Sequence, residues 1–221
     1  MHLPDGFITG EINLLSAAVS AAALGVALKK SGEELGDRQA PMLGVTSAFV
    51  FAAQMINFPI AAGTSGHFLG ASFAAIMLGP FNALIVMALA LTLQCLLFAD
   101  GGLTTLGTNF LNMGLIGGFG AYCVFIVLKA ILPQSKSGML TASAIASWFS
   151  VFASGALCGV ELGLSGAAPL HLAVSAMGGT HAIIGVGEAV ITSTVLSLAL
   201  NARPDIVRGF QYATVRREPQ P

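Results

Sequence analysis

Charged residues are scarce in this sequence: Asp, Glu, Lys and Arg make up 9% of its 221 residues, whereas hydrophobic residues make up 55%. A soluble domain carries roughly 25% charged residues, which keep its surface hydrated. The mean hydropathy of +0.85 points the same way. These values exclude a protein that faces water on all sides, and they predict an integral membrane protein.

Several familiar motifs are also absent. The three cysteines stand apart from one another, so neither a disulfide framework nor a zinc knuckle is indicated. The net charge of −1 gives no sign of the basic patch that nucleic-acid binding requires. Neither GxxxxGK[ST] nor HExxH occurs, so we expect no nucleotide bound by this chain and no zinc-peptidase activity. The first residues lack the features of a signal peptide, and we expect Met1 to be retained.

Long apolar runs recur along almost the whole chain, and about 20 helical residues suffice to cross the ~30 Å of hydrocarbon in a membrane. An all-α bundle of about seven spans is predicted, forming one domain over 1–221. The spans lie near 12–28, 42–56, 69–78, 81–98, 109–132, 139–160 and 182–200.

Two segments interrupt this regular pattern. The run 69–78 is too short to cross alone, and it follows the polar segment 57–68. Irregular backbone at membrane depth is tolerated only where protein buries it or where it lines a cavity. We therefore expect 57–68 to be a loop that lines a pocket on the outer side. Glycines and a proline predict a similar interruption over 163–181.

Basic residues indicate how the chain is oriented. With the amino terminus outside, all nine basic residues fall on the inner side, as the positive-inside rule expects. They are Lys29, Lys30, Arg38, Lys129, Lys136, Arg203, Arg208, Arg216 and Arg217. The sequence thus predicts a multi-pass protein of the cytoplasmic membrane, with an extracytoplasmic segment 1–11 and a cytoplasmic basic tail 202–221.

On this topology His2, His67, Asp100 and His171 lie on the outer side. A chain that begins X-His offers three nitrogens for one ion: the α-amine of Met1, the amide of His2 and the Nδ1 atom of its ring. The amine and the ring lose their protons near pH ~7.7–8 and ~6.5, whereas the amide proton is displaced by ions such as Ni(II) and Cu(II), with Co(II) a further candidate. His67 is the best-placed donor of a fourth nitrogen.

A histidine at position 2 is more often a flexible surface residue than a ligand. Here Pro4, Asp5 and Gly6 form a turn before the first span, and His67 lies in a polar segment of a very apolar chain. Polar residues at membrane depth are costly and usually functional. These features favour metal binding, and they predict Met1, His2 and His67 as ligands.

Other polar residues allow two interpretations. Asn57, Gln94 and Asp100 either orient the histidine rings, as ligating imidazoles usually require, or bond between helices. His181 and Glu188 are seven residues apart and share one helix face, where they form a packing pair or an ion relay. The ladders Ala17-Ala21-Gly25 and Gly44-Ala48-Ala52 let helices approach closely in lipid, either within the bundle or against a partner subunit.

Five segments together resemble the cobalt/nickel substrate-capture components of energy-coupling-factor transporters, the CbiM/NikM proteins. The segments are Met1-His2-Leu3-Pro4-Asp5-Gly6-Phe7, Asn57-Phe58-Pro59 through Gly63-Thr64-Ser65-Gly66-His67, Gln94 through Leu103, Asn109 through Gly114, and His181 through Ala189. The resemblance extends over nearly the whole chain, and the MHLPDG start combined with GTSGH is its most specific part.

The resemblance implies a seven-helix fold whose amino terminus enters a central pocket, where Met1, His2 and His67 hold Co(II) or Ni(II) in a square plane. It also implies a transmembrane coupling subunit, ATPase subunits and often a small accessory membrane protein, with Ala48 and Ala52 as candidates for docking the coupling subunit. The expected role is transport and not enzyme activity. Two alternatives stay open: a gradient-driven metal permease, and a metal-dependent membrane enzyme that uses Asp100. Both cobalt and nickel fit a set of four nitrogen ligands.

Overall fold

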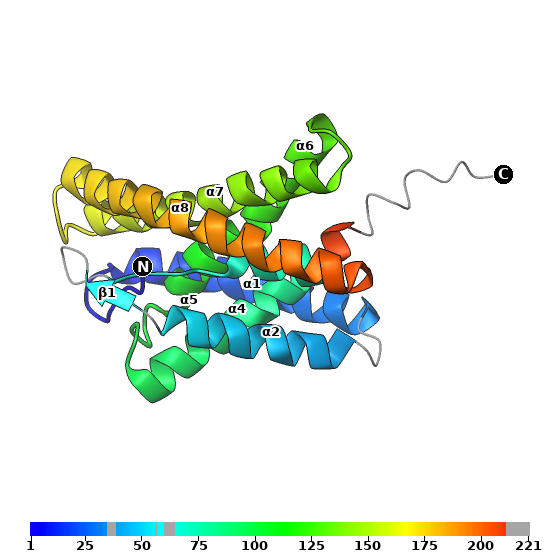
Figure 1. Cartoon of the computed structure of the whole chain (residues 1–221). Helices are drawn as coiled ribbons and strands as arrows, with labels where there is room; N and C mark the ends of the chain where they lie inside the picture. Colours follow the sequence, from blue (N-terminus) through cyan, green and yellow to red (C-terminus); the bar gives the residue numbers. More distant parts are fainter. Residues whose placement is uncertain (35–38, 56, 60–64, 211–221) are drawn as a thin grey trace.

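The structure is a computed structural model that describes residues 1–34, 39–55, 57–59 and 65–210 (Figure 1). Its helices are α1 (Gly10–Glu34), α2 (Gln39–Gln54), α3 (Ala71–Leu78), α4 (Pro80–Phe98), α5 (Leu106–Phe110), the π-helix η2 (Leu111–Gly120), α6 (Ala121–Ile131), α7 (Lys136–Leu164), α8 (Leu170–Ala202) and the 3-10 turn η3 (Pro204–Ile206). Strands β1 (Asn57–Pro59) and β2 (Ser65–His67) pair antiparallel, with Asn57 opposite His67. The predicted all-α membrane bundle is confirmed, since each predicted span coincides with one helix or one continuous helical run.

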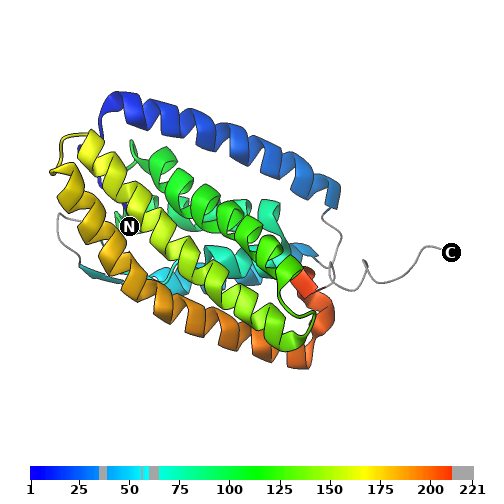
Figure 2. The same ribbon diagram turned by 90° about the horizontal axis from the view of Figure 1, so that it is seen from above.

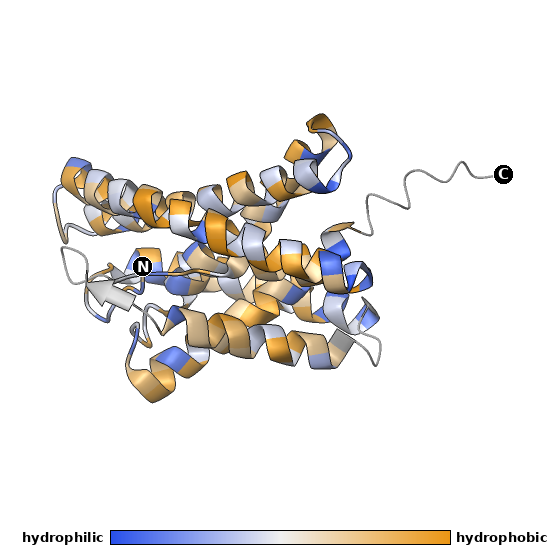
Figure 3. Cartoon of the chain, viewed as in Figure 1, coloured by the Kyte–Doolittle hydropathy of each residue, from blue (hydrophilic) through white to orange (hydrophobic). Residues whose placement is uncertain are grey.

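Five helical segments in the described part of the chain are long and apolar enough to cross a membrane: α1, α4, the run from α5 through α6, α7 and α8. Helix α2, with 16 residues, is shorter, and α3, with 8 residues, is about 12 Å long and cannot cross alone. Large apolar side chains such as Leu14, Val45 and Ile183 are each more than 60% exposed. Figure 3 shows hydrophobic residues along the length of the helices, as expected for contact with lipid.

The predicted interruption is present but much shorter than 163–181. Helix α7 continues to Leu164 and α8 already begins at Leu170, so the two helices are joined only by residues 165–169. Pro169 stands at the N-cap of α8, where the missing N–H group costs no helical hydrogen bond.

Gly155, Gly159 and Gly163 of α7 pack closely against α8, whereas Gly166 lies in the connection with a φ of +74°, and Gly178 and Gly179 lie within α8 without close contacts. A Cβ atom added at Gly155 would lie 2.4 Å from Cγ of His181, and one added at Gly159 would lie 2.7 Å from the Ala173 carbonyl oxygen. Small residues that let helix backbones approach closely are common between membrane helices. The α7 glycines therefore mark a tight helix contact, which a sequence pattern does not distinguish from a loop.

Helix α3 lies at the centre of the bundle, and all eight of its residues are buried. It begins after Gly70 and ends before Gly79, both of which have positive φ. At its carboxyl end the Arg208 guanidinium donates from Nη1 to the Leu78 carbonyl oxygen at 3.4 Å. Helix α3 therefore runs from the loop that carries His67 towards the end of the bundle that carries Arg208.

The turns gather at two opposite ends of the bundle (Figure 1). One end holds the amino-terminal segment, the β-hairpin and the 165–169 connection, and the other holds the 132–135 turn and η3. The segments predicted to lie outside and the described segments predicted to lie inside are thus at opposite ends, while Arg38, Arg216 and Arg217 lie outside the described residues. Figure 2 shows α1 along one edge of the bundle, beside the run from α5 through α6.

Both small-residue ladders are largely exposed, since Ala21 and Gly25 on α1 lie at the surface and only Ala17 is partly buried. Ala17 packs against Gly107, where an added Cβ would lie 2.5 Å from the Ala17 Cα atom. Ala48 and Ala52 are exposed on the outside of α2, and Gly44 has open space around it. The ladder on α2 therefore does not pack within the bundle.

Candidate metal site

The amino-terminal segment enters the bundle before α1 begins, and its first three residues are buried, with exposed fractions of 0% for Met1, 4% for His2 and 0% for Leu3. The Leu3 backbone holds this segment in place. Its N–H group donates to Asn109 Oδ1 at 2.8 Å, and its carbonyl oxygen accepts from Asn109 Nδ2 at 3.1 Å and from Thr105 Oγ1 at 2.5 Å. The Asn109 amide thus pairs with the Leu3 backbone as a neighbouring β-strand would.

Asp5 provides a second tether at the surface. Its carboxylate accepts from the Thr104 N–H group at 2.8 Å, from the Thr104 hydroxyl group at 2.5 Å and from the Leu103 N–H group at 3.2 Å. These bonds favour the ionised form and lower the pKa of Asp5 from its ordinary value of 3.8. Gly102 allows this close approach, since a Cβ there would lie 2.3 Å from Asp5 Oδ1.

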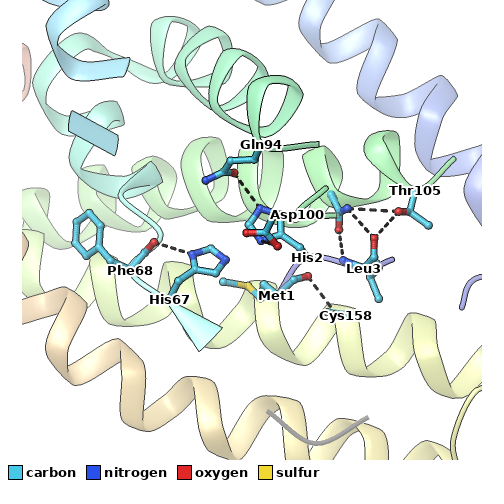
Figure 4. A network of polar contacts seen from close by, with 10 residues as sticks. Met1, His2, Leu3, His67, Phe68, Gln94, Asp100, Thr105 and Cys158 are labelled. Carbon is cyan, nitrogen blue, oxygen red and sulfur yellow. Dashed lines mark hydrogen bonds and ion pairs between the residues drawn. The ribbon is translucent and has the colours of Figure 1, made fainter. Parts of the chain in front are cut away.

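The His2 ring lies between Gln94 and Asp100 (Figure 4). Its Nε2 atom is 3.0 Å from Gln94 Oε1, and because a carbonyl oxygen only accepts, Nε2 carries the hydrogen. Nδ1 then keeps its lone pair and lies 3.3 Å from Asp100 Oδ1. Two electron-rich atoms that face each other in this way are stabilised when a cation comes between or beside them.

His67 is the last residue of β2, and its side chain is fully buried. Its Nδ1–H group donates to the Phe68 carbonyl oxygen at 2.8 Å, so the Nε2 atom keeps the lone pair. This atom is buried and has no hydrogen-bond partner. The rings of His2 and His67 stack, with centroids 4.7 Å apart and planes inclined at 27°. A buried pair of imidazoles therefore presents two available nitrogens in one place.

Burial favours the neutral form of all three nitrogen groups. It lowers the pKa of the Met1 α-amine from 8.0 to about 6, opposed by Cys158 and Asp100. It lowers the pKa of His2 to about 4, with a smaller contribution from the charge of the amine. The pKa of His67 is also lowered well below 6.5, by burial and then by His2. Near pH 7 the site therefore offers lone pairs to a metal ion and not ammonium or imidazolium groups.

Side chains alone do not form a metal site in the part of the chain that the structure describes, because no three His, Cys, Asp or Glu groups there come together in a suitable way. Two buried imidazoles lie together beside the Met1 terminus, however. A complete set of nitrogens requires the backbone of the first two residues. The arrangement is suited to a cation that accepts amine, amide and imidazole ligands.

The structure brings Gln94 and Asp100 into contact with His2, while the Asn57 side chain lies outside the described residues. His181 is buried and donates from Nδ1 to the Met177 carbonyl oxygen at 2.7 Å. Glu188 accepts hydrogen bonds from the backbone after His67. His181 and Glu188 share a buried face of α8 but bond to other groups and not to each other. His171 is exposed on the first turn of α8.

Sequence reasoning did not assign a site role to Asn109, Thr105 or Gln54. Gln54 is fully buried and donates from Nε2 to the Leu69 carbonyl oxygen at 2.6 Å. Asn109 stands out as an amide in an apolar run, so its burial was foreseeable, but its partner was not. The bonded partner in each case is a backbone group, and the direction of a backbone group depends on the fold and not on a residue pattern.

Comparisons with known proteins show the family of the chain. Residues 2–206 match the model of the CbiM family, described as the cobalt uptake substrate-specific transmembrane region. The chain is 39% identical to a putative fused nickel transport protein NikMN of Archaeoglobus fulgidus, over 94% of this chain and 68% of that protein. It is 38% identical to a putative metal transport protein of Haloquadratum walsbyi, over 94% and 93%. It is also 30% identical to a cobalt transport protein CbiM of Sorangium cellulosum, over 96% of each.

Two solved structures have the same fold. A crystal structure of a transition metal transporter superposes with a TM-score of 0.84 at 31% identity, covering 99% of this chain and 100% of the other. A truncated transition metal transporter superposes with a TM-score of 0.83 at 33% identity, covering 91% and 99%. The similarity thus extends over the whole bundle, including the elements that build the site.

Proposed function

Because the chain belongs to the CbiM family of substrate-specific components for cobalt and nickel uptake, we propose that it captures Co(II) or Ni(II) through an amino-terminal chelate. The Met1 amine, the His2 amide and the His2 Nδ1 atom supply three nitrogens, and the Nε2 atom of His67 supplies the fourth. The metal ion is the transported substrate of this chain and not a resident cofactor. The proposal places this end of the bundle on the outer side of the cytoplasmic membrane, with the carboxyl terminus inside.

One observation carries this proposal: the first two residues are buried beside His67, and the hydrogen bonds of both rings leave the required nitrogen atoms available. A buried polar atom without a partner costs roughly 1–3 kcal/mol. A terminus with no function would be expected to remain in water. Metal binding accounts for the burial, the orientation of the rings and the neutral state of the amine together.

The test compares a blocked terminus with a free one in the same protein. A multi-residue amino-terminal extension, removable by a protease that leaves Met1 first, turns the α-amine into a peptide nitrogen. We expect the extended protein to hold little Ni(II) or Co(II) and the cleaved protein to bind one ion, as measured by metal analysis. A single added residue is unsuitable, because X-X-His would itself supply a full square of nitrogens.

Equal metal content before and after cleavage would rule out the terminal amine as a ligand. Mass spectrometry of the loaded protein provides an independent check, since a formylated, acetylated or trimmed terminus on metal-bound protein contradicts the same proposal. The matched control is His2→Ala with a free amine, which we expect to bind as weakly as the extended protein.

We further propose that the captured ion passes inward through a complex with a transmembrane coupling subunit and ATPase subunits. Two features of the chain support this. The sequence has no phosphate-binding motif of the GxxxxGK[ST] type, and the ladder Gly44-Ala48-Ala52 lies exposed on α2, where a partner helix can approach closely. A small accessory membrane protein is a further candidate partner.

A further inference from the structure

The segment that follows His67 is held by a carboxyl group of helix α8, far away in the sequence. Glu188 lies in the middle of α8, 119 positions from Leu69, and is 1% exposed. Its Oε2 atom accepts from the Leu69 N–H group at 2.8 Å, and its Oε1 atom accepts from the Gly70 N–H group at 2.7 Å. Both carboxyl oxygens are therefore used on two consecutive peptide groups.

The first of these two peptide groups also contacts the His67 ring. The peptide that joins Phe68 to Leu69 presents its carbonyl oxygen to His67 Nδ1 at 2.8 Å and its N–H group to Glu188 at 2.8 Å. A peptide group is planar and rigid, and in the trans form its C=O and N–H bonds point in opposite directions. The carboxylate and the imidazole therefore hold opposite edges of one plane, and the orientation of that plane sets the orientation of the ring.

The second peptide group is fixed in a similar way. The peptide that joins Leu69 to Gly70 donates its N–H group to Glu188 and accepts at its carbonyl oxygen from Gln54 Nε2 at 2.6 Å. Gly70 itself has a φ of +72°, and an added Cβ would lie 2.9 Å from Phe68 Cε1. No other residue type fits this position without strain. Helices α2 and α8 thus hold the short segment between His67 and α3 from two sides.

We propose that Glu188 is a positioning residue for the metal site, acting on His67 through the Phe68–Leu69 peptide; this inference rests on the proposed function, in which His67 is a ligand. Metal-bound histidines commonly donate their second N–H group to a carboxylate or a carbonyl group, which fixes the ring and increases its basicity. Here a carbonyl group is the direct partner, and the carboxylate lies one peptide group beyond it. Hydrogen bonds in such a chain polarise one another and strengthen the last one.

The position of Glu188 also separates this role from simple helix stabilisation. Glu188 binds the amino end of α3 and Arg208 binds its carboxyl end. Both side chains satisfy backbone groups at the ends of α3 that have no partner within the helix. If Glu188 served only to stabilise α3, loss of Arg208 would affect the metal site in the same way. If Glu188 positions His67, only loss of Glu188 changes the ligand set.

The experiment uses the full chain with its native terminus, Ni(II) for affinity and Cu(II) as a spectroscopic probe. We expect Glu188→Ala to weaken Ni(II) binding about 10- to 100-fold, the range typical of groups that orient a metal ligand. Its Cu(II) d–d band should move to longer wavelength, as in His67→Ala, because water replaces one nitrogen in the plane. The double variant His67→Ala/Glu188→Ala should bind no more weakly than His67→Ala alone, since both changes remove the same interaction.

Three matched variants complete the test. Glu188→Gln keeps the shape of the side chain and one acceptor oxygen. If Glu188→Ala does not accumulate in folded form, the Ni(II) affinity and the Cu(II) band of Glu188→Gln are compared with those of the unmodified protein instead. Glu161→Gln changes another buried carboxyl group, which bonds to the Asn112 side chain at 2.5 Å and not to the segment between His67 and α3, and should leave the Cu(II) band unchanged. Arg208→Met loosens the other end of α3 and should also leave the band unchanged.

Additive losses in the double variant, or a Cu(II) band that stays the same in Glu188→Ala and Glu188→Gln, would overturn the inference. A shifted band in Arg208→Met would do so as well, because the effect would then come from α3 stability. Failure of the proposed function gives a different result: His67→Ala would keep the affinity and the band of the unmodified protein.

Discussion

Which nitrogen of each imidazole can bind a metal is decided by the partner of the other nitrogen. Gln94 holds the hydrogen of His2 on Nε2, and the Phe68 carbonyl group holds that of His67 on Nδ1. The chelate with the His2 amide requires Nδ1 of His2, because only this nitrogen closes a six-membered ring. The geometry therefore selects the nitrogen that the chelate needs before any metal arrives.

Much of this residue-level description follows from the sequence alone. The X-His start predicts the chelate, and a histidine in a polar segment of an apolar chain predicts the fourth donor. The Gln94 contact with His2 is among the expected orienting contacts. The role of the Phe68 carbonyl group is not predictable, because a backbone group carries no residue identity and its direction depends on how Glu188 and Gln54 hold the loop.

Two histidines on the predicted outer side give a direct test at this scale. We expect His67→Ala to weaken Ni(II) binding at least 100-fold, because the fourth nitrogen is replaced by water and a tenfold loss corresponds to about 1.4 kcal/mol. His171→Ala should leave the affinity unchanged, because His171 is exposed on the first turn of α8. Isothermal titration of both variants decides the matter, and a reversed order would mean that the loop containing His67 is not the metal loop.

At the scale of elements, the helices were easier to predict than the segments that join them. Each long apolar run became a helix, and the short run 69–78 became the buried helix α3. The interruption over 163–181 was predicted too long because glycine is compatible with a loop, with a close helix contact as at Gly163, and with a helix interior as at Gly178 and Gly179. The π-helix η2 also has no sequence signature, and it is stabilised by contacts such as the bond from the Ser154 hydroxyl group to the Asn112 carbonyl oxygen at 2.8 Å.

The docking of the amino-terminal segment on α5 gives a test at this scale. Asn109→Ala removes two hydrogen bonds from the Leu3 backbone, each contributing about 0.5–1.5 kcal/mol. We expect the free energy of Ni(II) binding, measured by isothermal titration, to become less favourable by about 1–3 kcal/mol in total. The reason is that the amino-terminal segment must then become ordered when the metal binds.

The matched control for this test is the neighbouring residue Thr108, which is fully buried and donates from its hydroxyl group to Asn13 Oδ1 on α1 at 2.8 Å. Thr108→Val changes one buried hydrogen bond of the same helix without touching Leu3. It should lower the unfolding temperature slightly and keep the metal affinity. Equal losses of metal affinity in both variants would show that the stability of α5 determines metal binding, and not the hydrogen bonds between Asn109 and the Leu3 backbone.

At the scale of the molecule, the distribution of charge and apolar surface predicts the architecture well. The described basic residues lie at one end of the bundle and the candidate metal site lies at the other, with the buried helix α3 between them. The sequence indicates this sidedness because lysine and arginine placement is strongly biased in membrane proteins. It does not indicate that Ala48 and Ala52 face outward, because a ladder of small residues looks the same whether it packs inside or outside.

This outward ladder leads to a prediction about transport. In proteoliposomes that contain the chain alone, we expect Ni(II) to bind in proportion to the protein and not to accumulate further, because capture by a buried square of nitrogens supplies no energy for release. Adding the coupling and ATPase subunits should produce accumulation that requires ATP.

Ala48→Leu and Ala52→Leu should reduce this ATP-dependent accumulation several-fold and keep Ni(II) binding, because larger side chains prevent close approach of a partner helix. Val45→Leu, at a site on α2 that is 67% exposed, is the control and should have little effect. Accumulation by the chain alone under an ion gradient would instead identify a permease that works without partners.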